Sequence, residues 1–152
     1  MYDVVIVGSG PAGLSAAIYA KRAGLSALTL EKNPMSGGQV LNTYEVDNYP
    51  GLPGINGFEL GMKFREHADK LGCEFKEASL ISVENIGAWE EKAELSAASV
   101  DAKSKKDQGF LLTTDQGEIR ARTVIAATGA SHAKLNVPGE AELAGMGVSY
   151  CA

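Results

Sequence analysis

The stretch that decides the fold class is Gly8-Ser9-Gly10-Pro11-Ala12-Gly13. It matches the pattern G-x-G-x-x-G and follows residues 3–7, whose apolar, largely β-branched character is typical of a parallel strand covered on both faces. Pro11 suits the first turn of a helix, and Gly24 stands where a glycine would end it. Residues 27–30 form the next apolar run. The sequence therefore predicts a βαβ unit with a right-handed connection.

The same stretch predicts a dinucleotide site. Gly8 permits a tight turn, Gly10 lets the backbone approach a pyrophosphate, and Gly13 allows close packing of helix on strand. The helix N-terminus offers free N–H groups and a positive dipole end to phosphates. Glu31 ends the second strand at the expected distance and can accept hydrogen bonds from an adenosine ribose. A glycine turn without a ligand is the alternative, which this strand and helix context disfavours.

The middle of the chain alternates loop, helix and strand patterns. Residues 33–57 are rich in Gly, Pro and Asn, and we expect so long a loop to be functional. Residues 58–71 have helical spacing and end at Gly72. The apolar side chains that we expect to face inward are Leu60, Phe64, Ala68 and Leu71. A short strand should follow at residues 74–76.

Residues 80–86, 109–114 and 118–122 predict a three-stranded antiparallel β-meander, whose last two strands are joined by a turn at residues 115–117. Residues 87–108 form a polar excursion that could be helical or a loop. Residues 123–127 predict a second buried strand. Together with the βαβ unit, these patterns predict an α/β domain with a parallel sheet and a meander.

Composition excludes several function classes. A net charge of −5 gives no attraction for nucleic acid or an anionic membrane. Residues 4–20 are uncharged, but Asp3 and the interrupting glycines argue against a targeting segment. Two cysteines are too few for a secreted disulfide scaffold, so a reducing cytosol is expected. His67 and His132 lack partners spaced for metal binding or catalysis, and we expect both at the surface; Cys73 is expected to be a small buried side chain.

Further motifs extend along almost the whole chain apart from residues 87–108. They are Gly37-Gly38-Gln39, Asn48-Tyr49-Pro50-Gly51, Ala127-Thr128-Gly129-Ala130, Val137-Pro138-Gly139-Glu140 and Gly147-Val148-Ser149-Tyr150-Cys151-Ala152. With the glycine-rich stretch, they make the sequence resemble the low-molecular-weight thioredoxin reductases, which are pyridine nucleotide-disulfide oxidoreductases. The resemblance implies a Rossmann-like FAD-binding domain. Residues 1–130 would be its first segment, and 131–152 a linker and the start of an NADPH-binding domain.

The resemblance also implies roles for individual residues. The FAD-binding set would be Gly8, Ser9, Gly10, Pro11, Ala12, Gly13, Glu31, Lys32, Gly38, Gln39, Asn48, Ala78, Thr128 and Gly129. Ser9 to Ala12 would hold the pyrophosphate, Ala78 would offer backbone hydrogen bonds to the adenine, and Gln39 would approach the flavin. For Gln39 and Asn48 the alternative is an amide that caps its own turn.

Cys151 is the candidate catalytic residue. In the family, this cysteine begins a C-x-x-C pair that accepts electrons from reduced flavin and passes them to thioredoxin; here the chain ends at Ala152, before the second cysteine. Without that resemblance, Cys151 would be an ordinary free thiol. The implied parent is a cytoplasmic, homodimeric enzyme in which NADPH reduces FAD and the dithiol reduces thioredoxin. We expect the given chain alone to bind FAD weakly and to lack this activity.

Other functions stay open at this point. The flavoprotein reductases of peroxiredoxins share the motifs but carry an extra N-terminal region. The ferredoxin or flavodoxin reductases of similar fold lack the cysteine pair. A hypothesis of another class is a nucleotide-binding module without catalytic competence.

Overall fold

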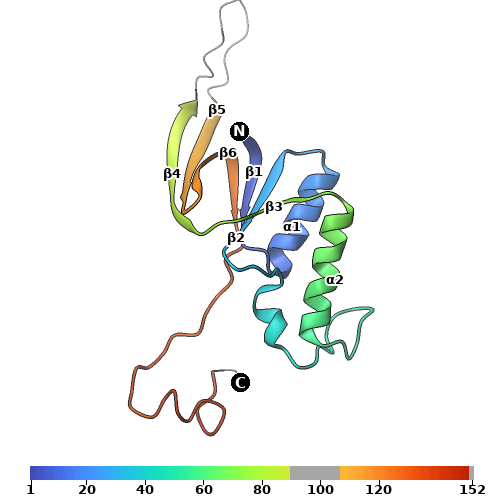
Figure 1. Ribbon diagram of the computed structural model, residues 1–152, viewed down its shortest axis with the longest axis vertical. Helices are drawn as coiled ribbons and strands as arrows, with labels where there is room; N and C mark the ends of the chain where they lie inside the picture. Colours follow the sequence, from blue (N-terminus) through green and yellow to red (C-terminus); the bar gives the residue numbers. More distant parts are fainter. Residues whose placement is uncertain (90–106, 151–152) are drawn as a thin grey trace, which may run out of the picture.

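The computed structural model describes residues 1–89 and 107–150. Within them the strands form one six-stranded sheet in the order β3-β2-β1-β6-β5-β4 (Figure 1). The elements along the chain are β1 (Tyr2–Val7), α1 (Pro11–Arg22), β2 (Ala27–Glu31), η1 (Gly38–Asn42), α2 (Gly57–Lys70), β3 (Glu74–Glu77), β4 (Leu80–Trp89), β5 (Asp107–Thr114) and β6 (Gly117–Ala126). This confirms the predicted α/β class with a parallel part and a meander.

The βαβ unit forms as the sequence predicts. β1 pairs in parallel with β2, Val4 opposite Ala27 and Val7 opposite Leu30. Pro11 opens α1, and the helix ends before Gly24, whose φ of 74° is a conformation that glycine adopts without a Cβ penalty. β3 then adds to the outer edge of β2, also in parallel.

Two apolar layers cover the parallel strands. On one face, Val4 and Ile6 pack against Ala17 and Ala20 of α1, and α2 lies beside α1 (Figure 1). The other face carries a second cluster in which side chains of β1 and β2 meet the meander: Val5, Val7, Leu28, Leu30, Ala78, Leu112, Ile119 and Ala121. Coverage on both faces explains why β1 and β2 are almost continuously apolar. Of the four residues predicted to face inward along this helix, Leu60 and Ala68 are buried, whereas Phe64 and Leu71 are half-buried.

The meander differs from the prediction in its last strand. Residues 118–122 and 123–127 were expected as two strands, but β6 runs unbroken from Gly117 to Ala126. No turn residue separates them, and the strand instead changes partner at Ala121, which pairs with Phe110 of antiparallel β5 and with Tyr2 of parallel β1. Beyond this point β6 pairs in parallel with β1, Thr123 opposite Val4 and Ala126 opposite Val7.

The expectation that residues 123–127 are buried is wrong. Ile125 is 41% exposed and Ala126 is also exposed. The reason is that β5 pairs with β6 only as far as Ala121, so that within the described residues no strand pairs with the outer edge of β6 beyond that point. An apolar sequence therefore lies at an open edge.

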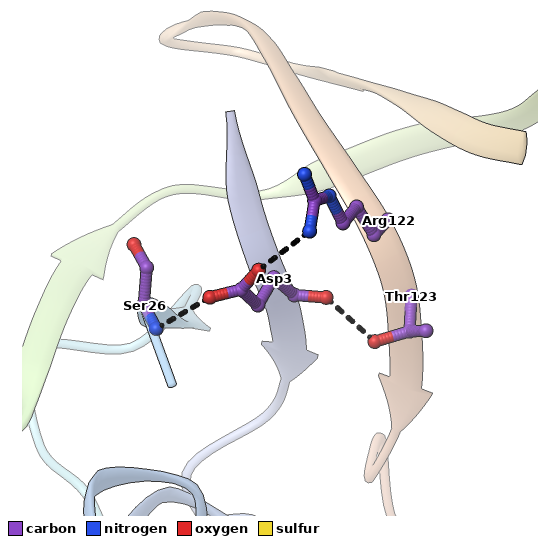
Figure 2. A network of polar contacts seen from close by, with 4 residues as sticks. All are labelled: Asp3, Ser26, Arg122 and Thr123. Carbon is purple, nitrogen blue, oxygen red and sulfur yellow. Dashed lines mark hydrogen bonds and ion pairs between the residues drawn. The ribbon is translucent and has the colours of Figure 1, made fainter. Parts of the chain in front are cut away.

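Asp3, near the N-terminal end of β1, forms a network of polar contacts with the neighbouring strands (Figure 2). Its carboxylate accepts a hydrogen bond from the Ser26 backbone N–H at 2.9 Å and lies 3.4 Å from the Arg122 guanidinium. The Asp3 carbonyl accepts from the Thr123 hydroxyl at 2.8 Å. One residue thus ties β1 both to the start of β2 and to the point where β6 joins it.

The remaining segments adjust the predicted boundaries. β4 and β5 reach into the predicted excursion, ending at Trp89 and beginning at Asp107, and residues 90–106 lie outside the described part. The long loop of residues 33–57 contains η1 and a bridge between Val46 and Ile55. Among the described residues no helix has the length and apolar character to cross a membrane.

Candidate nucleotide-binding site

Two glycines of the loop after β1 are required by the protein's own packing. A Cβ on Gly8 would lie 2.3 Å from the Ala127 carbonyl oxygen, and Gly8 has a φ of 102°. A Cβ on Gly13 would lie 1.8 Å from the Gly8 carbonyl oxygen. Both positions therefore exclude any side chain, which confirms the close packing of helix on strand that the spacing predicts.

Gly10 is different. Its φ of −70° and ψ of −177° suit any residue, and a Cβ there would meet nothing nearer than the Gly38 Cα at 3.9 Å. Neither backbone strain nor a protein neighbour requires glycine at this position. The bare backbone of Gly10 instead leaves open the space that an approaching pyrophosphate would fill.

The N-terminus of α1 lies at the same place. Its N-cap is Gly10, which supplies no side-chain cap, and the first turn contains no acidic residue. Pro11 and Ala12 are exposed. The first N–H groups of this helix are therefore not capped by a side chain, and they give the loop a positive end suited to phosphate.

A second loop closes against the first. The Gly37 N–H donates to the Ser9 carbonyl at 2.8 Å. A Cβ on Gly38 would come within 3.2 Å of the Gly10 Cα, and the Gly38 φ is 59°. The predicted residues Gly38 and Gln39, at the start of η1, are thus brought to the glycine loop, and Gln39 is exposed there.

Glu31 joins the two strands at this edge of the sheet. Its Oε2 accepts from the Ser9 N–H at 2.9 Å and from the Ser9 hydroxyl at 2.6 Å. Its Oε1 accepts from the backbone N–H and the side-chain amide of Asn33 at 2.9 and 3.1 Å. Burial raises the pKa of Glu31, but the four hydrogen bonds outweigh burial and the net pKa is lowered. Glu31 is therefore a firmly held carboxylate anion.

The other predicted residues lie near Glu31 or near the end of β6. Ala78 is buried next to Glu31, and its N–H donates to the Glu31 carbonyl at 2.9 Å. A backbone hydrogen bond to adenine would have to use the Ala78 carbonyl. Lys32 is exposed beside Glu31, and the exposed Thr128 and Gly129 follow Ala127, whose N–H donates to Val7.

Asn48 lies farther along the chain, in the exposed loop that leads to α2. The ring of its neighbour Tyr49 packs edge-on against Phe64 of α2, with the ring centroids 5.3 Å apart. This part of the loop thus contacts α2, and the bridge between Val46 and Ile55 closes the loop on itself. Its predicted approach to a flavin stays a prediction.

Comparison with known proteins assigns the chain to a family. The model of the pyridine nucleotide-disulphide oxidoreductases matches residues 2–152. The chain belongs to this family. It is 43% identical over 152 residues to the thioredoxin reductase of Bacillus subtilis (strain 168), covering all of this chain and 42% of that protein. The chain thus spans less than half the length of this curated relative.

Solved structures of thioredoxin reductases support this assignment to the family. The thioredoxin reductase from Streptococcus pyogenes MGAS5005 is 38% identical, with a TM-score of 0.75 over 99% of this chain and 42% of that one. The Lactococcus lactis thioredoxin reductase in its FR conformation is 38% identical, with a TM-score of 0.74 over 94% of this chain and 40% of that one. The chain is similar to these oxidoreductases in fold as well as in sequence.

The predicted catalytic residue, Cys151, lies outside the described residues. Cys73 is half-buried rather than fully buried, because it lies at the margin of the cluster beneath α1. Burial raises the pKa of the Cys73 thiol, which does not favour a reactive thiolate. His67 and His132 are exposed as predicted. No group of three or more His, Cys, Asp or Glu side chains suited to a metal ion occurs in residues 1–89 and 107–150.

Sequence reasoning missed a second held carboxylate. Glu140 is only 6% exposed and accepts from the backbone N–H groups of Leu135 and Asn136 and from the Tyr150 hydroxyl, at 2.9, 2.6 and 2.5 Å. The Tyr150 hydrogen bond is the main reason that the pKa of Glu140 is lowered. The Tyr150 ring also stacks on His132.

Asn33 was missed as well. Glu31 and Asn33 stand only two residues apart, so that a local contact between this carboxylate and the Asn33 N–H groups could have been considered from the sequence. The Glu140 contacts had no such signal, because Tyr150 is ten residues away and no element lies between them to fix their separation.

Proposed function

We propose that the site binds FAD through its adenosine and pyrophosphate half. The observation that carries this proposal is the open space over Gly10, beside a glycine loop whose other two glycines are closed by the protein itself. The uncapped N-terminus of α1 would meet the pyrophosphate, and the ionised Glu31 would meet the ribose. The residues present therefore fit the group that the family implies.

Each residue has a separate task in this proposal. Gly10 and Gly38 have no side chains and so leave room for the phosphates. Gln39 follows Gly38 directly, in η1. Lys32 and Ala78 flank Glu31 on the adenosine side. FAD, when bound, supplies hydride and electron transfer between a nicotinamide and a disulfide, whereas the protein binds and orients it.

For the whole protein, we propose an NADPH-dependent thioredoxin-disulfide reductase. Support comes from the thioredoxin reductases to which the chain is similar over its full length. In this proposal Cys151 is one half of a redox pair, the partner is thioredoxin or a similar disulfide protein, and the enzyme is a cytoplasmic homodimer. Residues 1–130 belong to the FAD domain, and residues 131–152 lead toward an NADPH domain.

A titration of the purified chain tests FAD binding. Quenching of FAD fluorescence should saturate for the wild type and should be abolished by Gly10→Val, because the added side chain occupies the space for the pyrophosphate. His67→Ala, an exposed change on α2, is the control and should leave the titration unchanged. Thermal melting of each variant confirms that it is folded. Equal titrations for wild type and Gly10→Val would refute the site.

A further inference from the structure

The carboxylate of Glu31 has no acceptor capacity left in this structure. An ionised carboxylate offers about four lone-pair positions. All four are used, because Ser9 and Asn33 each donate twice to Glu31. A ribose hydroxyl can therefore reach this carboxylate only by displacing a donor.

The four donors differ in how readily they can leave. Ser9 is wholly buried, its hydroxyl makes a short bond of 2.6 Å, and its carbonyl is held by Gly37. Both backbone N–H groups are fixed by the course of the chain. The side-chain amide of Asn33 is the exception, because Asn33 is exposed and the amide makes the longest of the four bonds, 3.1 Å. On leaving, it can be satisfied by water at little cost.

We propose that the side-chain amide of Asn33 occupies the position of a ribose hydroxyl on Glu31 and is exchanged for that hydroxyl when the nucleotide binds, while the Ser9 hydroxyl stays bound and orients the carboxylate. The proposal rests on the proposed function and adds to it two residues with opposite effects. Asn33 competes with the nucleotide. Ser9 is a positioning residue that acts through Glu31.

The test is calorimetric titration of the full 152-residue chain with ADP, which carries the ribose and a pyrophosphate. Asn33→Ala should bind ADP about threefold to fivefold more tightly, since one exposed, long hydrogen bond to the Glu31 carboxylate no longer has to be broken. Ser9→Ala should bind about tenfold more weakly, because a charge-assisted bond that orients Glu31 is lost. Asn85→Ala, at an exposed asparagine of β4, and Ser15→Ala, on α1, are matched controls without effect.

Two further readouts separate these roles from general structural damage. With 2′,3′-dideoxyadenosine diphosphate, which lacks the hydroxyls, Asn33→Ala should bind as the wild type does. In Ser9→Ala the pKa of Glu31 should rise, so that ADP affinity begins to fall at a higher pH than in the wild type. In nuclear magnetic resonance spectra, the Asn33 side-chain amide signals should shift with ADP and stay in place with the dideoxy compound.

The outcomes distinguish the two proposals. A folded wild-type chain that binds neither ADP nor FAD overturns the proposed function and this inference with it. ADP binding that Asn33→Ala leaves unchanged or weakens overturns the inference alone. Tighter binding by Asn33→Ala, confined to the nucleotide that has ribose hydroxyls, supports it.

Discussion

Two carboxylates of this chain are held by similar donors in very different surroundings. Glu31 and Glu140 each accept from backbone N–H groups and from one hydroxyl, and the pKa of each is lowered. Glu31 reaches Ser9 across 22 residues, between two strands that the sheet already aligns. The donors to Glu140 come from within ten residues, in a segment of turns after β6.

The two carboxylates are held in place by different kinds of contact. The pairing of β1 with β2 and the close glycine contacts hold the Glu31 site in place in addition to its own hydrogen bonds. Residues 131–150 have no such support, since the structure gives them turns and one isolated bridge, between Ala144 and Val148. We therefore expect changes near Glu31 to affect the whole domain or its ligand, and changes at Glu140 to act locally.

The largest effect is expected from Gly13→Ala. Its Cβ would overlap the Gly8 carbonyl oxygen at 1.8 Å, and both groups belong to the backbone or its first atom, so neither can move aside. We expect the free energy of unfolding in urea to fall by more than about 3 kcal/mol. Gly10→Ala is the matched control, because its Cβ would make only an ordinary contact, 3.9 Å from the Gly38 Cα; the cost there should stay below about 1 kcal/mol. Similar losses for both variants would contradict this account.

The next effect is expected from Glu31→Gln. The amide cannot accept from all the donors of Ser9 and Asn33, so the free energy of unfolding should fall by about 1–3 kcal/mol. ADP affinity should fall about tenfold or more, measured by calorimetry. Glu140→Gln serves as the comparison and should leave ADP affinity unchanged. A loss of affinity in Glu140→Gln would show that the two regions are coupled.

A local effect is expected from Glu140→Gln. Hydrogen exchange of the Leu135 and Asn136 amides should become faster, and proteolysis within residues 131–150 should accelerate, while the urea midpoint of the domain stays constant. The Tyr150 phenol, whose pKa is raised by its bond to Glu140, should titrate at a lower pH in the variant, as followed by its ultraviolet absorbance. Glu142→Gln, at an exposed glutamate, is the control.

The smallest effect is the dependence of stability on pH. Glu31 has a folded pKa below its ordinary 4.5, so its contribution is fully present above pH 4.5 and is lost as pH falls through the folded pKa. The urea midpoint of the wild type should decline below pH 4.5, and that decline should be smaller in Glu31→Gln. In Glu140→Gln the decline of the midpoint should match that of the wild type, whereas acid should no longer change the protection factors for hydrogen exchange of residues 135 and 136. Equal declines in all three proteins would remove Glu31 as the cause.

The elements that could be predicted from the sequence are those that depend on residues close to one another in the chain. Strand, glycine loop, helix and second strand follow from apolar runs, from Pro11 and from Gly24, and each formed within one or two residues of the prediction. The G-x-G-x-x-G pattern and Glu31 were predicted to lie together, and the structure brings them together through Ser9. These features could be predicted because backbone sterics and short-range burial fix them within a few residues.

Contacts between segments that are far apart in the sequence could be seen only in the folded structure. The fold joined the last two predicted strands into β6, because a strand can change partner at Ala121 without any signal in its sequence. In the folded chain Ser9 and Asn33 also donate hydrogen bonds to Glu31. Tyr150 donates to Glu140 in residues 131–150. The physical reason is that hydrogen-bond saturation and the pairing of an edge depend on which groups lie within about 3 Å of one another. That proximity is a property of the folded chain.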